Sequence, residues 1–258
     1  MRYTEESGHL RYTLCVSTQV GCVMGCVFCA TGQGGFFRNL TAGEIVGQIL
    51  DITHTRRQTD PGFKISNVVY MGMGEPLQNY DAVLRSILIL NHAEGQQIGI
   101  RRITVSTCGI PGQIRRLANE GLDIVLALSL HSPEDALRSR LMPVNRRYPL
   151  DEVMAACRDY AEKTGRRITF EYILIQDVND SLKQAGSLCQ LLKGIPCNVN
   201  IIPINQGEHG FKKPSRANQM LFKNALEKCG ITAVIREEKG ADIAGACGQL
   251  AGQKKQGE

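Results

Sequence analysis

Hydrophobic and polar positions follow two different periods along the chain. Short apolar or β-branched runs predict strands, and they occur at residues 11–17, 67–71, 102–106, 123–129, 168–174, 198–202 and 232–236. Apolar residues three and four apart predict helices between them, and the clearest cover residues 41–56, 133–141, 150–163 and 216–228. Three more helices are expected: one carrying Val83 to Leu88, a short one from Pro111, and one capped by Asp180.

This order of strands and helices predicts the fold class. A strand followed by a helix, repeated along the chain, indicates an α/β protein with a parallel sheet and right-handed crossovers. Six such units fit a partial, open (β/α)6 barrel. We expect residues 1–236 to form this barrel core. Residues 237–258 begin with a stretch rich in Gly and Ala, and we expect them to form a mobile C-terminal tail.

Composition and charge restrict the class of protein without identifying it. The chain has 258 residues, 43% of them hydrophobic, which is ordinary for a globular protein. No apolar run approaches the roughly 20 residues that cross a bilayer, and the N-terminus lacks a signal-peptide core. We therefore expect a cytoplasmic protein without a membrane partner. The net charge of +5 is compatible with binding nucleic acid but does not establish it.

Three cysteines lie within eight residues, as Cys22-x3-Cys26-x2-Cys29. Thiolates are soft ligands for iron–sulfur clusters or zinc. No His or Cys follows at a spacing that would supply a fourth zinc ligand, which favours a cluster with one open iron. A structural metal site or three unrelated cysteines remain as alternatives. Nothing points to secretion, so the ten cysteines do not indicate a disulfide framework.

Polar and glycine-containing segments follow the predicted strands. Besides the cysteine motif, these segments are Gly72–Pro76, Ser106–Gly109, Ser129–His131 and Pro203–Asn205. In parallel α/β sheets, ligands bind at the carboxyl ends of the strands. Each segment alone is more often a turn or a structural feature. Their convergence at one edge predicts a binding site.

The cysteine spacing resembles that of the radical S-adenosylmethionine (SAM) superfamily. Nearly the whole chain resembles its RlmN and Cfr branch of RNA adenine methyltransferases, and Gly72-Met-Gly-Glu-Pro76 resembles the RlmN type. The resemblance implies a [4Fe-4S] cluster held by Cys22, Cys26 and Cys29, with SAM on the fourth iron. It also implies a set of residues that line the SAM pocket: Gly74, Glu75, Ser106, Ser129, Leu130, His131 and Asn205.

Two further cysteines acquire roles only through this resemblance. It makes Cys247 the residue that carries a methyl group and Cys15 the second catalytic cysteine. The cysteines that match no catalytic position of the family are interpreted as core or surface thiols: Cys108, Cys157, Cys189, Cys197 and Cys229. One SAM methylates Cys247. A radical made from a second SAM then abstracts hydrogen from that methyl group, the methylene radical adds to carbon 2 of an adenine, and Cys15 helps to resolve the adduct. The implied partners are large-subunit ribosomal RNA, a tRNA anticodon loop and an electron donor such as flavodoxin, and the expected state is a monomer.

The chain departs from the family pattern at its N-terminus. Relatives carry a small helical domain and a glutamate thought to act as general base, and both would precede residue 1. We therefore expect slow turnover on RNA from this chain by itself. Three alternatives remain open: a Cfr-like carbon-8 methyltransferase, another radical SAM enzyme, or a non-catalytic iron–sulfur module that binds RNA.

Overall fold

The computed structural model describes residues 2–4, 10–205 and 210–236, and its centre is one curled sheet. The strand order is β1-β2-β5-β6-β7-β8-β9-β10. Only β1 (Arg2–Thr4) is antiparallel to its neighbour, β2 (Leu10–Cys15). The other strands are all parallel: β5 (Asn67–Tyr70), β6 (Ile103–Thr107), β7 (Val125–Ser129), β8 (Ile168–Leu174), β9 (Cys197–Pro203) and β10 (Thr232–Ile235).

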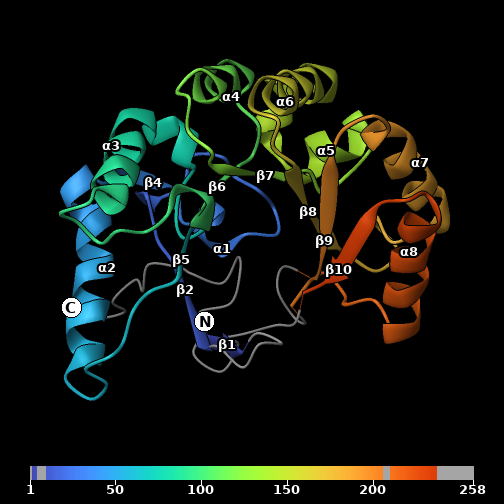
Figure 1. Cartoon of the computed structure of the whole chain (residues 1–258). Coiled ribbons are helices and arrows are strands. Elements are labelled where there is room, and N and C mark those ends of the chain that lie inside the picture. The colour runs from blue at the N-terminus through green and yellow to red at the C-terminus, as the bar shows by residue number, and fades with distance from the viewer. Residues whose placement is uncertain (1, 5–9, 206–209, 237–258) are drawn as a thin grey trace, which may run out of the picture.

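Helices cover the outer face of this sheet, so the molecule is a half-barrel (Figure 1). They are α2 (Ala42–Arg57), α3 (Tyr80–Asn91), α4 (Pro111–Ala118), α5 (Asp135–Leu141), α6 (Leu150–Thr164), α7 (Leu182–Leu192) and α8 (Arg216–Lys228). The expected α/β class and partial barrel are thus confirmed. The tail at 237–258 lies outside the described residues.

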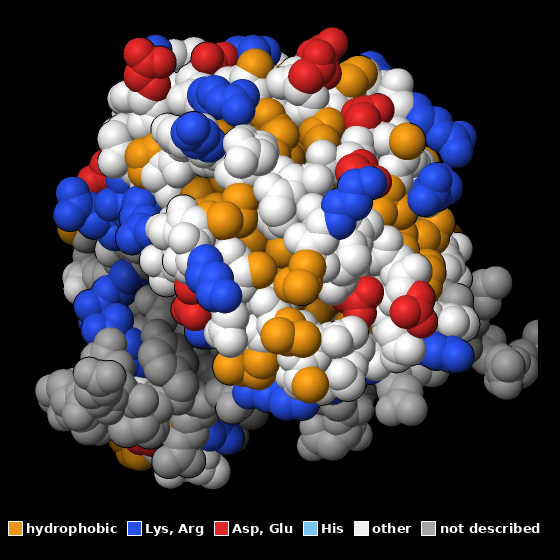
Figure 2. Space-filling model, turned by 90° about the vertical axis from the view of Figure 1, so that its right-hand side faces the viewer, with side chains coloured by type: hydrophobic (Ala, Val, Ile, Leu, Met, Phe, Trp, Pro, Cys, Tyr) orange, Lys and Arg blue, Asp and Glu red, His pale blue; other side chains and the backbone are white. Residues whose placement is uncertain are grey.

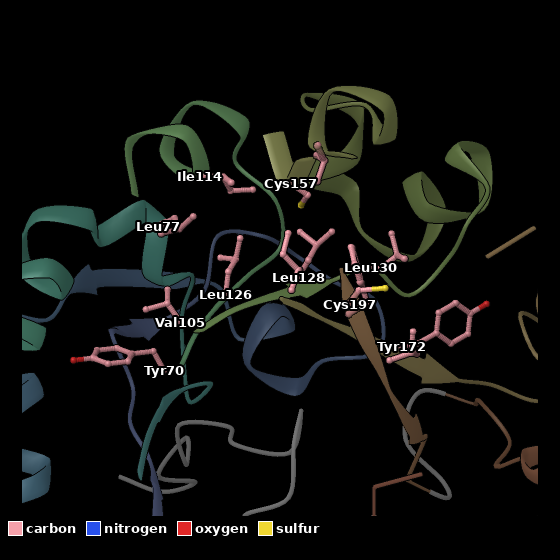
Figure 3. Packing of buried hydrophobic residues seen from close by; sticks show 14 of the residues in the cluster. Tyr70, Leu77, Val105, Ile114, Leu126, Leu128, Leu130, Cys157, Tyr172 and Cys197 are labelled. Atoms are coloured by element: carbon pink, nitrogen blue, oxygen red, sulfur yellow. The ribbon is translucent and has the colours of Figure 1, made fainter. Parts of the chain in front are cut away.

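The two faces of the strands differ in chemistry because successive side chains point to opposite sides. On the outer face, Val105, Leu126, Phe170, Val199 and their neighbours are fully buried under the helices. Figure 3 shows several of these side chains between sheet and helices. The inner face carries more polar side chains, including Thr104, Ser106, Thr169, Asn198 and Asn200, at the intervening positions.

Helix starts follow local hydrogen-bonding chemistry. Thr41 caps α2 and forms a capping box with Glu44, as the sequence predicts. The predicted cap of α7 is wrong by one residue, because Ser181, not Asp180, accepts the Gln184 N–H bond at 3.2 Å. The Asp180 carboxylate instead accepts a hydrogen bond from the Asp177 N–H group at 3.0 Å.

A small hairpin that the sequence analysis did not predict frames the cysteine motif. β3 (Gln19–Gly21) pairs antiparallel with β4 (Phe36–Asn39), and the short helix α1 (Ala30–Gln33) lies between them in the chain. Gly21 is required there, because a Cβ atom at this position would lie 2.0 Å from the Gly35 carbonyl oxygen.

One interpretation of the cysteines is wrong. Cys189 on α7 and Cys229 at the end of α8 form a disulfide, with their Cα atoms 6.2 Å apart. The two helices pack side by side, which brings together residues 40 positions apart in the chain. Spacing in the sequence gives no indication of this pairing.

The outer surface over α7 and α8 does not present a large patch of like-charged side chains. Lys and Arg side chains are scattered among acidic and hydrophobic ones on this face (Figure 2). Within the described residues, no helix combines the length and the apolar character needed to cross a membrane.

Candidate functional site

The cysteine motif forms a loop at the carboxyl end of β2. Its backbone is closed by a hydrogen bond from the Cys22 N–H group to the Gly35 carbonyl at 2.8 Å, and by one from Cys29 to Cys26 at 3.1 Å. Gly25 adopts a φ of 63°, a left-handed conformation that glycine accepts at little cost. The loop therefore holds all three cysteines at the edge where ligands bind in parallel sheets.

The thiols of this loop lie in a shielded environment. Cys26 is 6% exposed, and burial raises the pKa of Cys22 to about 12 and also raises that of Cys29. Cys26 contacts the Cys108 thiol at the end of β6. Metal ligation requires the thiolate form, so binding of a cluster at this loop would release the thiol protons.

The donor set suits an iron–sulfur cluster better than a single ion. Among residues 2–4, 10–205 and 210–236, no group of three or more Cys, His, Asp or Glu is arranged to hold one metal ion. Cysteines that each bind a different iron of a cluster lie farther apart than the ligands of one ion. The three thiols lie on one short loop and interact electrostatically with one another, so they are near enough to bind the irons of one cluster.

The Gly72–Pro76 segment follows β5 and packs tightly against the chain that leads to the cysteines. A Cβ atom at Gly72 would lie 2.7 Å from the Ser17 Oγ atom. Gly74 has a φ of 103°, and a Cβ atom there would lie 2.5 Å from the Gln19 side chain. Both glycines are thus needed to bring the segment against the cysteine loop.

Glu75 is 1% exposed and its carboxylate is held by backbone donors. Oε1 accepts a bond from the Leu77 N–H group at 3.0 Å, and Oε2 accepts one from Cys108 N–H at 2.7 Å. Burial raises the pKa of Glu75, while these bonds oppose the shift. The carboxylate therefore joins the ends of β5 and β6.

Ser106 and Ser129 lie on the inner face of the sheet near the ends of β6 and β7. Strand register places Ser106 beside Ala127 and Ser129 beside Glu171. Both serines are partly exposed, unlike the outward-facing residues beside them. Their hydroxyl groups can accept or donate hydrogen bonds to a polar ligand on that face.

His131 ends the segment that follows β7. It has a φ of 59° and its Nδ1 atom accepts a hydrogen bond from the Ile173 N–H group at 3.0 Å. Its ring contacts Phe28 edge-to-face, with centroids 4.9 Å apart. Burial lowers the pKa of His131 to about 3, so the neutral imidazole is the stable form. His131 thereby connects β8 to the cysteine loop.

Cys15 and Asn205 occupy the same edge of the sheet. Cys15 is the last residue of β2 and pairs with Val69, which places it on the inner face. Asn205 lies two residues beyond β9 and is partly buried. Cys247 lies outside the described residues.

Two inner-face residues were missed by the sequence analysis. Glu171 on β8 is 7% exposed and its Oε1 atom accepts a hydrogen bond from Asn200 Nδ2 on β9 at 2.8 Å. Burial raises the pKa of Glu171. A charged residue inside the apolar run of residues 168–174 is a signal that could have identified it. Because Ser129 neighbours Glu171, this pair adjoins the candidate pocket.

Comparisons with known proteins agree with this geometry. The Radical SAM superfamily profile matches residues 16–186. The probable dual-specificity RNA methyltransferase RlmN of Thermotoga neapolitana is 54% identical over 95% of this chain and 70% of its own length. The corresponding protein of Heliobacterium modesticaldum is 53% identical, covering 99% of this chain and 66% of its own length. The chain thus spans about two thirds of these relatives.

Solved structures give the same result. The crystal structure of a radical SAM methyltransferase from Sphaerobacter thermophilus aligns with a TM-score of 0.89 at 48% identity, covering 96% of this chain and 75% of that one. Streptococcus suis SuiB bound to S-adenosylmethionine aligns with a TM-score of 0.62 at 16% identity, over 88% of this chain and 51% of that one. The second similarity shows the fold alone.

Proposed function

Because the chain belongs to the RlmN family of radical SAM RNA methyltransferases, we propose that it methylates carbon 2 of adenosine in large-subunit ribosomal RNA and in a tRNA anticodon loop. The observation that carries this proposal is the 54% identity over 95% of the chain, which includes the cysteine loop and Gly72–Pro76. The dual specificity for which these relatives are named supports two RNA substrates.

We assign the cofactor-binding roles to residues at the carboxyl edge of the sheet. The radical SAM family uses a [4Fe-4S] cluster and SAM, which together supply one-electron chemistry. Cys22, Cys26 and Cys29 would hold the cluster. SAM would lie against a set of inner-face and strand-end residues: Gly74, Glu75, Ser106, Ser129, Leu130, His131 and Asn205.

We assign the covalent step to Cys247 and its resolution to Cys15. A thiolate at Cys247 attacks the methyl carbon of SAM, forming a sulfur–carbon bond and releasing S-adenosylhomocysteine. Carbon 2 of adenine bears no lone pair, which explains why a carrier is needed before transfer to the base. The inner-face position of Cys15 supports its role, because an adduct on that face would be within its reach.

Exposed aromatic side chains support RNA as the substrate at this edge. Phe36 is 45% exposed and Phe37 is 74% exposed on β4, the strand that follows the cysteine loop. Unpaired bases stack on aromatic side chains of this kind. An unpaired adenosine that reaches the cysteine loop would bring its neighbouring bases to this hairpin.

The remaining partners follow from the chemistry. We propose a small one-electron carrier such as flavodoxin as reductant, a monomeric enzyme and a cytoplasmic location, where the thiols that would hold the cluster are protected from oxidation.

Mapping methylated adenosines in RNA tests the function. Cells that lack their own enzyme and express the full-length gene should contain 2-methyladenosine, and the Cys247→Ala variant should produce none while keeping its iron. Cys197→Ala is the matched control, because Cys197 is buried on β9 away from these roles. Methylation at carbon 8 would show a Cfr-like enzyme, and methylation by Cys247→Ala would refute the carrier role.

A further inference from the structure

Arg138, in the middle of α5, is the largest fully buried side chain of the described residues. A guanidinium is always charged, and a charged group is rarely buried completely without a partner. None of the roles assigned above involves this residue. Its environment therefore needs an explanation.

The Arg138 guanidinium binds the ends of two neighbouring strands. Nε donates to the Leu130 carbonyl at 3.1 Å, while one terminal nitrogen donates to the Ser129 carbonyl at 3.1 Å and to the Cys108 carbonyl at 2.6 Å. The other terminal nitrogen donates to Asn145 Oδ1 at 2.5 Å. One side chain thus fixes the end of β6 relative to the segment after β7.

All four of these acceptors are uncharged. No carboxylate within residues 2–4, 10–205 and 210–236 forms an ion pair with Arg138. Two indirect links reach a carboxylate. Asn145 Nδ2 donates to the exposed Asp135 carboxylate at 2.8 Å, and Cys108, whose carbonyl accepts from Arg138, donates its N–H group to the buried Glu75 carboxylate at 2.7 Å. A buried cation without a direct counter-ion is costly, so this position favours an anion nearby.

The cysteine loop is where that anion would be. Arg138 interacts electrostatically with the thiols of Cys26 and Cys108. The end of α5 also holds the loop, because the Leu141 carbonyl accepts a hydrogen bond from the Val27 N–H group at 3.0 Å. The charge is therefore fixed in position relative to the cluster ligands.

We propose that Arg138 is a positioning residue that raises the reduction potential of the cluster and clamps the two strand ends of the SAM pocket. The inference rests on the proposed cluster site at Cys22, Cys26 and Cys29. Reduction adds one negative charge to an already anionic cluster, and a fixed cation stabilises the reduced form more than the oxidised form. The carbonyl contacts account for the second part of the role.

The two parts can be separated with two substitutions. Arg138→Gln removes the charge and should shift the reduction equilibrium of the cluster about tenfold toward the oxidised form, the size expected for one partly screened charge. A tenfold shift corresponds to about 59 mV for a one-electron couple. Arg138→Lys keeps the charge, so the potential should stay near that of the wild type. Its ammonium has three donors on a single nitrogen and cannot make the four hydrogen bonds of the guanidinium, so the dissociation constant for SAM should rise at least about tenfold.

The experiment is an anaerobic redox titration of the reconstituted full chain, followed by electron paramagnetic resonance, with SAM affinity measured by equilibrium dialysis. Arg140→Gln is the matched control, because it removes an exposed charge from the same helix. It should change neither quantity. Iron content and the spectrum of the wild type test the cluster assignment separately from the role of Arg138.

An unchanged potential in cluster-loaded Arg138→Gln would overturn the charge role, and equal losses of potential in the Lys and Gln variants would do the same. Unchanged SAM affinity in Arg138→Lys would overturn the clamp. If Arg138→Gln does not retain a cluster, Asn145→Asp provides the decisive measurement, because it places a carboxylate against the guanidinium. This variant should lower the potential, and an unchanged value would overturn the proposal.

Discussion

Acid should destabilise this protein through His131, which is buried as a neutral imidazole. Burial, with the nearby Arg138 charge, lowers the pKa of His131 from 6.5 to about 3. Between these values the unfolded chain binds a proton that the folded chain does not. The stability that the neutral ring contributes is therefore fully present above about pH 6.5 and is lost progressively as the pH falls toward 3.

The size of the effect follows from the two pKa values. Each unit of pH between them changes the free energy of unfolding by at most about 1.4 kcal/mol. The loss is less than about 1 kcal/mol at pH 6 and about 2 kcal/mol at pH 5, relative to neutral pH. Because His131 is only 6% exposed, solvent screening reduces this value little.

The assay compares the wild type with His131→Asn in urea unfolding, using preparations of equal iron content. Asn accepts the φ of 59° more readily than most residues, and its Oδ1 atom can replace Nδ1 as acceptor for the Ile173 N–H group. The stability difference between the two proteins should shrink by about 2 kcal/mol from pH 7.5 to pH 5. A difference that stays constant over this range would refute the reasoning, because other titrating groups are shared.

Three further predictions concern the cysteines and the RNA surface. Cys26→Ala should abolish the brown chromophore and the bound iron, whereas Cys157→Ala should keep both. About four irons per chain in Cys26→Ala would contradict the cluster assignment. Cys189→Ser should lower the free energy of unfolding by about 4 kcal/mol under oxidising conditions, because the disulfide closes a loop of 40 residues, and dithiothreitol should remove the difference from the wild type. Phe37→Ala should weaken RNA binding by about 1 to 3 kcal/mol without changing how the affinity depends on salt concentration. Leu50→Ala, which changes another exposed apolar residue, should have no effect. A weaker salt dependence of RNA binding in Phe37→Ala would count against stacking.

The sequence predicts the regular part of the fold well, for a physical reason. Strands β5 to β9 are buried on one face, and helices such as α6 and α7 carry apolar stripes, so their periods are clear in the sequence. The hairpin of β3 and β4 was missed because its strands have three and four residues and all four side chains of β4 are exposed. No hydrophobic pattern marks such strands.

The candidate site was predictable only where short motifs mark the strand ends. The glycines of Gly72–Pro76 reflect a close approach of two backbones, and this requirement is visible in the sequence. Arg138 and Glu171 lie within helix and strand patterns, and their partners come from other elements. The same holds for the Cys189–Cys229 disulfide, since only the packing of α7 on α8 determines it.

The two faces of each central strand respond to different selective pressures. On β8, Phe170 and Tyr172 pack under the helices, whereas Thr169, Glu171 and Ile173 face inward. A substitution at an outward position lowers the folding stability. A substitution at an inward position mainly alters what the half-barrel can bind. An open barrel of this kind can change its substrate without rebuilding the core that supports it.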